Sequence, residues 1–181
     1  MVIGLAGAAR SGKDTFYMLL SDELQGRAEC KRLAFADELK EDLKPLLMEK
    51  FNIDPTNTTE HEKNLIRPLL VAYGTDLVRN IDKKYWIKKI SKKIKSNNKT
   101  IFIITDVRYP NESEWVKSFK ESVMVFIERD GAPPANQEES KNCPILKSNS
   151  DYVVSWPTYP NGQINERLSF VKSFINEKIQ I

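Results

Sequence analysis

Nine residues near the start of the chain have the types and spacing of a phosphate-binding loop. The apolar run 1–6 is followed by Gly7-Ala8-Ala9-Arg10-Ser11-Gly12-Lys13-Asp14-Thr15, and a helical pattern continues from Phe16. The glycines allow the backbone to curl so that its N–H groups point into one concavity, and a lysine there can reach the terminal phosphates. A strand before and a helix after the loop favour this interpretation over an ordinary glycine-bearing turn. We therefore expect the loop to hold ATP, with Ser11 and Lys13 among its contacts.

Two positions in the chain are candidates to hold Mg2+. Asp14 stands where Ser or Thr usually supplies the metal hydroxyl, and Thr15 comes one residue later. A carboxylate there repels a phosphate unless Mg2+ lies between them, so we favour Thr15 as the ligand and keep Asp14 as the alternative. The apolar run 101–104 leads through Thr105 to Asp106, as in a Walker B element. Asp106 could hold Mg2+ directly or through water, or could simply cap a buried strand.

Arg108 and Glu112 follow this run. The planar guanidinium of Arg108 suits a bidentate contact with phosphate. Glu112 lies near a helix start at Pro110, and we expect it either to orient Arg108 or to stabilise the helix N-terminus. We also count Glu112 and Arg108 among the candidate substrate-binding residues.

A second group of residues lies in a long segment with no strand pattern. It offers carboxylate, guanidinium and aromatic groups of the kinds that a nucleoside monophosphate requires for its phosphate, sugar and base. Each also has a plain structural interpretation, as a core aromatic or a surface ion pair. The candidates are Asp37, Arg67, Tyr73, Arg79 and Trp86.

The elements that must position these groups alternate between short apolar runs and helical segments. The pattern predicts an α/β fold with a five-stranded parallel sheet, helices on both faces and a lid. Ligands bind at the carboxyl edge of such sheets, so Gly7, Asp37, Asp106 and Arg129 should converge on one rim. We expect a helical acceptor-binding region at 37–98, a lid at 129–150 whose residues 132–150 lack periodicity, and a last helix from about Ile164. The predicted strands are 1–6, 30–35, 100–105, 122–128 and 152–156.

Composition narrows the class of protein. A chain of 181 residues with a net charge of +3 suits one domain and a small anionic substrate better than nucleic acid. The lysine-rich stretch 83–99 is interpreted as the solvated face of a helix. Two cysteines are too few for a disulfide framework, and no run approaches the roughly 20 apolar residues of a membrane helix. We expect a single cytoplasmic domain, 1–181, with no nucleic-acid or membrane partner; a homodimer is left open.

Four ordered blocks resemble the phage deoxynucleoside monophosphate kinases, a branch of the P-loop nucleotide kinases. The first is the loop ending in Gly-Lys-Asp-Thr, and the others lie at 35–40, 67–79 and 105–112. The resemblance implies the three-layer P-loop kinase fold. It also implies transfer of the γ-phosphoryl group of ATP to a deoxynucleoside monophosphate with Mg2+, in the host cytoplasm if the gene is phage-encoded. It also implies that Gly7, Gly12, Lys13 and Thr15 hold ATP and metal, that Asp106 serves metal or substrate, and that Asp37, Arg67, Arg79 and Arg108 face the acceptor.

One feature departs from that family. Lids of nucleotide kinases commonly supply arginines to the transfer, yet 132–150 contains none, only Lys141 and Lys147. Arg10 and Arg129 are therefore the expected sources of that charge, or else a lysine. Two alternatives to the nucleotide kinase are a kinase of another phosphorylated small molecule, such as phosphomevalonate, and a nucleotide-binding regulatory module without an acceptor.

Overall fold

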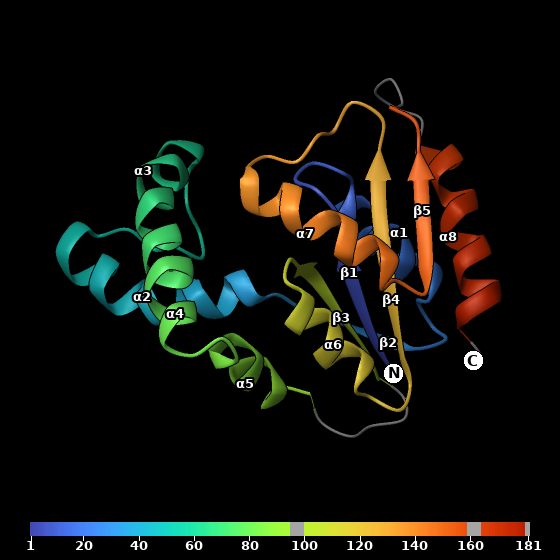
Figure 1. Ribbon diagram of the computed structural model, residues 1–181, viewed down its shortest axis with the longest axis horizontal. Coiled ribbons are helices and arrows are strands. Elements are labelled where there is room, and N and C mark those ends of the chain that lie inside the picture. Colours follow the sequence, from blue (N-terminus) through green and yellow to red (C-terminus); the bar gives the residue numbers. More distant parts are fainter. Residues whose placement is uncertain (95–99, 159–163, 180–181) are drawn as a thin grey trace. The chain divides into compact units, whose positions relative to one another are not determined.

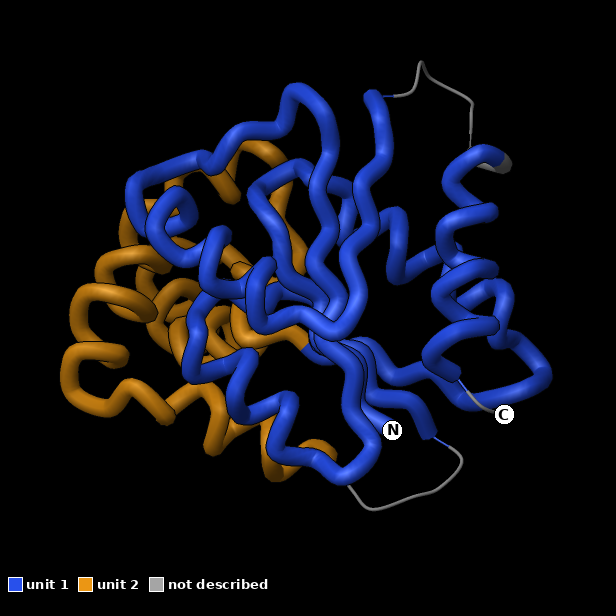
Figure 2. The backbone as a smooth tube through the Cα atoms, turned by 45° about the vertical axis from the view of Figure 1, so that its right-hand side comes forward, with its two compact units in different colours: residues 1–33, 96–181 blue, residues 34–95 orange. Residues whose placement is uncertain are grey.

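The chain divides into two compact units. The computed structural model describes residues 1–94, 100–158 and 164–179; unit 1 comprises Met1–Leu33 and Ser96–Ile181, and unit 2 comprises Ala34–Lys95 (Figure 2). Unit 2 closely matches the segment predicted to be helical, and its described residues form helices and no strand. The helical character of that segment is confirmed, while its acceptor-binding role stays a prediction.

Unit 1 contains the predicted sheet (Figure 1). Its five strands are all parallel and are ordered β2-β3-β1-β4-β5. The strands are β1 (Val2–Ala6), β2 (Glu29–Leu33), β3 (Thr100–Val107), β4 (Ser122–Arg129) and β5 (Tyr152–Trp156). The three central strands are almost continuously apolar and buried, as expected when helices cover both faces, whereas edge strand β2 exposes three of its five side chains. The predicted fold class is confirmed.

Helices pack on both faces of this sheet. Alternate residues of β1, Ile3 and Leu5, share one buried cluster with α1 (Lys13–Glu23) and α8 (Ile164–Lys178). The intervening Gly4 faces α6 (Pro110–Lys117), where a Cβ on it would lie 3.2 Å from the Val116 side chain. The predicted last helix is α8, and its Val171, Phe174 and Ile175 enter the core.

One expectation for unit 1 is wrong. Residues 132–150 lack helical periodicity and were therefore expected to form a long loop, but residues 137–148 form the helix α7 (Gln137–Ser148). The role of this segment as a lid stays a prediction. The helix begins with a strong cap, since Asn136 Oδ1 accepts a hydrogen bond from the Glu139 N–H at 2.8 Å, and it buries Leu146. These local and tertiary contacts outweigh the weak apolar pattern and the cost of Pro144 within the helix.

Unit 2 has its own small core. Leu43, Leu47, Ile53 and Ile66 are buried together. The elements are α2 (Phe35–Phe51), α3 (Glu60–Val71), the π-helix η1 (Ala72–Val78), α4 (Arg79–Ile81) and α5 (Tyr85–Ser91).

The sequence pattern at Gly74-Thr75 predicts the end of one helix and the cap of the next, but the chain passes through both residues as π-helix. A Cβ on Gly74 would lie 2.8 Å from Leu39, so this glycine permits close packing instead of ending a helix.

Across the described ranges, no helix is long and apolar enough to cross a membrane.

Candidate functional site

The predicted phosphate-binding loop connects β1 to α1 and depends on its glycines. Gly7 has φ 140° and Gly12 has φ 100°, both in the region that side chains disfavour. A Cβ on Gly7 would lie 2.1 Å from the Ile127 carbonyl oxygen, so no larger residue fits. The Ser11 side chain is 1% exposed, and its Oγ has no hydrogen-bond partner within the described chain. A curled backbone and an unsatisfied hydroxyl are what a bound phosphate chain requires.

Trp156, at the end of β5, packs against this loop at Ser11 and Gly12. Its Nε1 donates to the Ser11 carbonyl oxygen at 2.8 Å, and the side chain is almost fully buried. A Cβ on Gly12 would lie 2.5 Å from the indole ring. The tryptophan therefore fixes the loop where it turns into α1, a role that its position in a strand does not reveal from the sequence.

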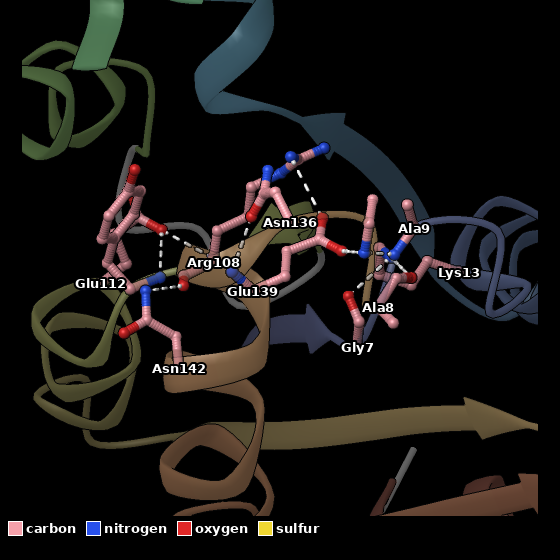
Figure 3. Close-up of polar contacts among 11 residues, drawn as sticks. Gly7, Ala8, Ala9, Lys13, Arg108, Glu112, Asn136, Glu139 and Asn142 are labelled. Carbon is pink, nitrogen blue, oxygen red and sulfur yellow. Dashed lines mark hydrogen bonds and ion pairs between the residues drawn. The ribbon is translucent and has the colours of Figure 1, made fainter. Parts of the chain in front are cut away.

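Lys13 lies over the loop. Its Nζ donates to the carbonyl oxygens of Gly7 at 2.9 Å and Ala8 at 2.6 Å (Figure 3). Burial lowers the pKa of Lys13, and the positive charge of Arg108 lowers it further. The carboxylates of Glu139 and Asp14 act in the opposite direction. The positive charges of Lys13 and Arg108 repel each other at this loop, and this repulsion favours binding of a strongly anionic ligand.

Arg108 follows the last residue of β3, and three contacts hold it (Figure 3). Its backbone N–H donates to Glu112 Oε2 at 2.8 Å, and its carbonyl oxygen accepts from Asn142 Nδ2 at 3.1 Å. Its Nη1 lies 3.4 Å from Glu139 Oε1, while the guanidinium side chain keeps 53% exposure. The backbone is thus fixed while the charged fork remains accessible.

Glu112 was expected either to orient Arg108 or to stabilise the helix N-terminus, and it was also a candidate substrate contact. It is fully buried, and its carboxylate accepts from the backbone N–H groups of Arg108 and Tyr109 at the start of α6. Both interpretations of its local role are therefore realised at once, because capping the helix also fixes Arg108. These contacts give the buried carboxylate a structural role, while its role as a substrate contact stays a prediction.

The first turn of α7 adds a carboxylate to the loop. Glu139 Oε2 accepts from the Ala9 N–H at 3.1 Å and from the Ala135 N–H at 3.0 Å (Figure 3). Burial alone would raise the pKa of Glu139, but these two N–H donors and the charges of Arg108 and Lys13 bring it below its ordinary value. Glu139 therefore stays ionised within the site. The sequence carried one signal for it: Asn136 three residues before a Glu is a helix-start pattern.

The predicted rim forms in part. Gly7 follows β1, Asp106 lies within β3 and Arg129 ends β4, and these three strands are adjacent. Asp37 belongs instead to the first turn of α2 in unit 2, because β2 ends at Leu33 and α2 begins at Phe35.

The two arginines expected to supply charge differ in their surroundings. Arg10 is exposed and has φ 62°, an uncommon value for a residue with a side chain. The Nε of Arg129 is buried and has no hydrogen-bond partner in the part of the chain described. A buried unsatisfied donor is costly, which fits a group that serves a ligand.

Oxygen donors that fit Mg2+ lie on this unit. Thr15 is in the first turn of α1, Asp14 beside it is exposed, and Asp106 is half-buried. Mg2+ is usually held by one or two protein oxygens together with substrate phosphates and water, so this set suits it.

Apart from Arg108 in unit 1 and the candidate Glu112 beside it, the predicted acceptor residues are in unit 2, and two of them belong to its packing. Trp86 is 3% exposed, contacts Tyr73 edge to face with ring centroids 6.3 Å apart, and donates to the Gly74 carbonyl oxygen at 3.2 Å. Arg67 is exposed on α3, and Arg79 is half-buried at the start of α4. The core interpretation of Trp86 therefore holds, while the arginines stay candidates.

The comparisons with known proteins agree with this geometry. A family model described as phosphomevalonate kinase matches residues 5–122, well over half of the chain. The chain belongs to the phosphomevalonate kinase family. The match spans the phosphate-binding loop, all of unit 2, β3 and α6. The description of this family model does not mention the phage deoxynucleoside monophosphate kinases, so membership of that branch stays a prediction.

Solved structures share the fold of this phosphomevalonate kinase family member. Shikimate kinase from Bacteroides thetaiotaomicron has a TM-score of 0.51 at 12% identity, covering 97% of this chain and 98% of that one. Shikimate kinase from Acinetobacter baumannii has a TM-score of 0.48 at 14% identity, covering 99% and 95%. The first of these shows a common P-loop kinase fold. Among curated proteins, no sequence matches the chain.

Proposed function

We propose that this chain is an ATP-dependent phosphotransferase that acts on a small acceptor already bearing a phosphate, and that this acceptor is a deoxynucleoside monophosphate. The observation that supports this most is that two positive charges, Lys13 and Arg108, act on each other within the site. Both cations follow adjacent strands at the carboxyl edge of the sheet. Their repulsion, which lowers the pKa of Lys13, costs free energy that a bound anion would offset. Two phosphate groups, one from each substrate, would offset that cost.

The chemistry follows from position and charge. Gly7, Ser11 and Gly12 would hold the ATP phosphates, with Lys13 at the transferred group. Arg108 would contact the acceptor phosphate, whose oxygen attacks the γ-phosphorus in line while ADP leaves. Mg2+, held by Thr15 and Asp106, would neutralise charge on the phosphates. No covalent enzyme intermediate is needed, because the protein only aligns the groups and stabilises charge.

The choice of acceptor rests on the four blocks that resemble the deoxynucleotide kinases. Asp37, Arg67 and Arg79 would serve the nucleotide. The packing of Tyr73 and Trp86 assigns these aromatics to shaping unit 2 instead.

The family model favours a second candidate acceptor, phosphomevalonate. Its chemistry is close to the first, since both acceptors present a phosphate monoester and both products are diphosphates. Arg108 would have the same role in either reaction. The two candidates differ in whether a base and a sugar must also be bound.

A transfer screen tests both candidates. ATP, Mg2+ and the protein are combined with each deoxy- and ribonucleoside monophosphate, with phosphomevalonate, and with shikimate as an acceptor that lacks a phosphate. We expect a diphosphate product and ADP with at least one deoxynucleoside monophosphate, and none with shikimate. Turnover with phosphomevalonate alone would select the second candidate. ATP binding that no acceptor converts into ADP formation would support a nucleotide-binding regulatory module instead.

A further inference from the structure

Glu139 contacts the two parts of the site that are expected to bind phosphate. One oxygen accepts from the Ala9 N–H in the phosphate-binding loop, and the other lies 3.4 Å from Arg108 Nη1 (Figure 3). Lys13 is also close enough for its charge to influence this carboxylate. An anion therefore lies among the donors of the site, and it comes from α7.

Capping of α7 does not account for all of these contacts. The cap itself needs the Asn136 acceptor and the Ala135 N–H, both beside the helix start. The bonds to Ala9 and Arg108 instead join residues that are distant in sequence. A side chain that served only its own helix would not need them.

From this geometry we propose that Glu139 competes with the phosphates of the nucleotide for the same donors. The carboxylate holds the first turn of α7 on the loop and pairs with Arg108 until a nucleotide displaces it. Binding of the donor then frees the Arg108 guanidinium for the acceptor. This inference rests on the proposed function and adds an order of events to it.

The rest of α7 is suited to such a movement. Leu146, near its far end, is 2% exposed and anchors the helix in the core. Before the helix, Gly131 has φ 74° and is exposed, so the chain leading to Glu139 can change direction there. Asn142 binds the Arg108 carbonyl oxygen one turn further along, which links the helix to Arg108 a second time.

Glu139→Gln tests the competition. Glutamine still accepts hydrogen bonds at this helix position, so the cap is kept while the negative charge is lost. We expect inorganic triphosphate and a non-hydrolysable ATP analogue to bind about tenfold more tightly, the effect of removing one charge-assisted competitor. Glu138→Gln is the matched control, because it removes the same charge from an exposed neighbour and should change affinity less than about twofold.

Isothermal titration calorimetry measures these affinities. Unchanged or weaker binding by Glu139→Gln would overturn the proposal, since Glu139 would then be neutral or would support the ligand. An equal gain in both variants would also overturn it, because general electrostatics would explain the effect. If neither probe binds the unsubstituted protein, the donor site and the proposed function fail together. Normal binding with no effect of Glu139→Gln removes only the competition.

Movement of α7 has a separate readout. Cys143 lies one turn after Glu139 and is half-buried, and Cys30→Ser leaves it as the single thiol. We expect the ATP analogue to speed modification of Cys143 by a thiol reagent. The reaction rate of Glu139→Gln does not measure movement, because the Glu139 charge itself raises the pKa of the Cys143 thiol and its loss would speed the reaction. Slower or unchanged modification of Cys143 in the presence of the analogue would show that α7 stays on the loop, which contradicts the proposal.

Discussion

The phosphate-binding region of unit 1 and the helical unit 2 reach their chemistry in different ways. In unit 1 the backbone does much of the positioning: Gly7 and Gly12 adopt positive φ, and Trp156 supports the turn. In unit 2 the candidate groups are side chains, and Trp86 is already committed to packing. A site built from backbone geometry is therefore visible in a short motif, whereas one built from side chains depends on how each of them packs.

The largest expected effect removes the central cation of unit 1. Lys13→Ala should reduce phosphoryl transfer by about 10³-fold, because the transferred group loses a preorganised positive charge. The fold should remain, since within the described residues Lys13 Nζ bonds to carbonyl oxygens of its own loop. Steady-state kinetics and circular dichroism check this, with the exposed Lys63→Ala as control. Retained turnover would remove the loop from the reaction.

A glycine pair tests whether the backbone of unit 1 is the decisive feature. Gly7→Ala should destabilise the protein by about 3 kcal/mol or more and abolish ATP binding, because the new Cβ meets the Ile127 carbonyl oxygen at positive φ. Gly26→Ala shares the positive φ but has nothing within 4 Å, so it should cost only about 1 kcal/mol. Denaturant unfolding compares the two. Equal losses would mean that the close approach at Gly7 is unimportant.

Two arginines compare the units directly. Arg108→Ala should lower kcat/KM for the acceptor about 100-fold, through loss of a charge-assisted contact to its phosphate. Arg67→Ala in unit 2 should raise the acceptor KM about tenfold and leave ATP affinity unchanged. Acceptor kinetics at saturating ATP give both values. If Arg67→Ala has no effect while Arg108→Ala does, the acceptor is held without α3, and the unit 2 assignment is wrong.

The same contrast explains what the sequence revealed. The five strands and the final helix were predictable because apolar runs and helical spacing are local signals, and the loop because its glycines are obligatory. The start of α7 was missed, since its stability comes from a cap and from the distant bond between Glu139 and Ala9. The continuation of helix through Gly74 was missed because close packing against Leu39 replaces the usual helix end. Contacts between distant residues leave no short pattern.

A smaller effect is expected within unit 2. Trp86→Phe keeps an aromatic ring but removes the hydrogen bond to the Gly74 carbonyl oxygen, so the free energy of unfolding should fall by about 1 kcal/mol. Acceptor KM should change less than about twofold, because the indole is buried and leaves little surface for a substrate. Urea unfolding and acceptor kinetics measure the two effects. A large rise in KM with unchanged stability would restore Trp86 as a substrate contact.

The smallest effect concerns pH and returns to unit 1. Because burial and Arg108 lower the pKa of Lys13, kcat/KM for ATP should fall on the alkaline side at a lower pH than an ordinary lysine would give. The unfolded state holds this proton to higher pH than the folded state does, so Lys13 penalises folding below its folded pKa and the penalty fades as pH rises towards the ordinary value. Glu139 raises the pKa of Lys13, so Glu139→Gln should move the alkaline limb to lower pH, while Glu138→Gln leaves it in place. Coincident limbs for Glu139→Gln and the unsubstituted protein would show that this carboxylate does not act on Lys13. The charge coupling that distinguishes the phosphate site from unit 2 would then have to come from Arg108 and Asp14.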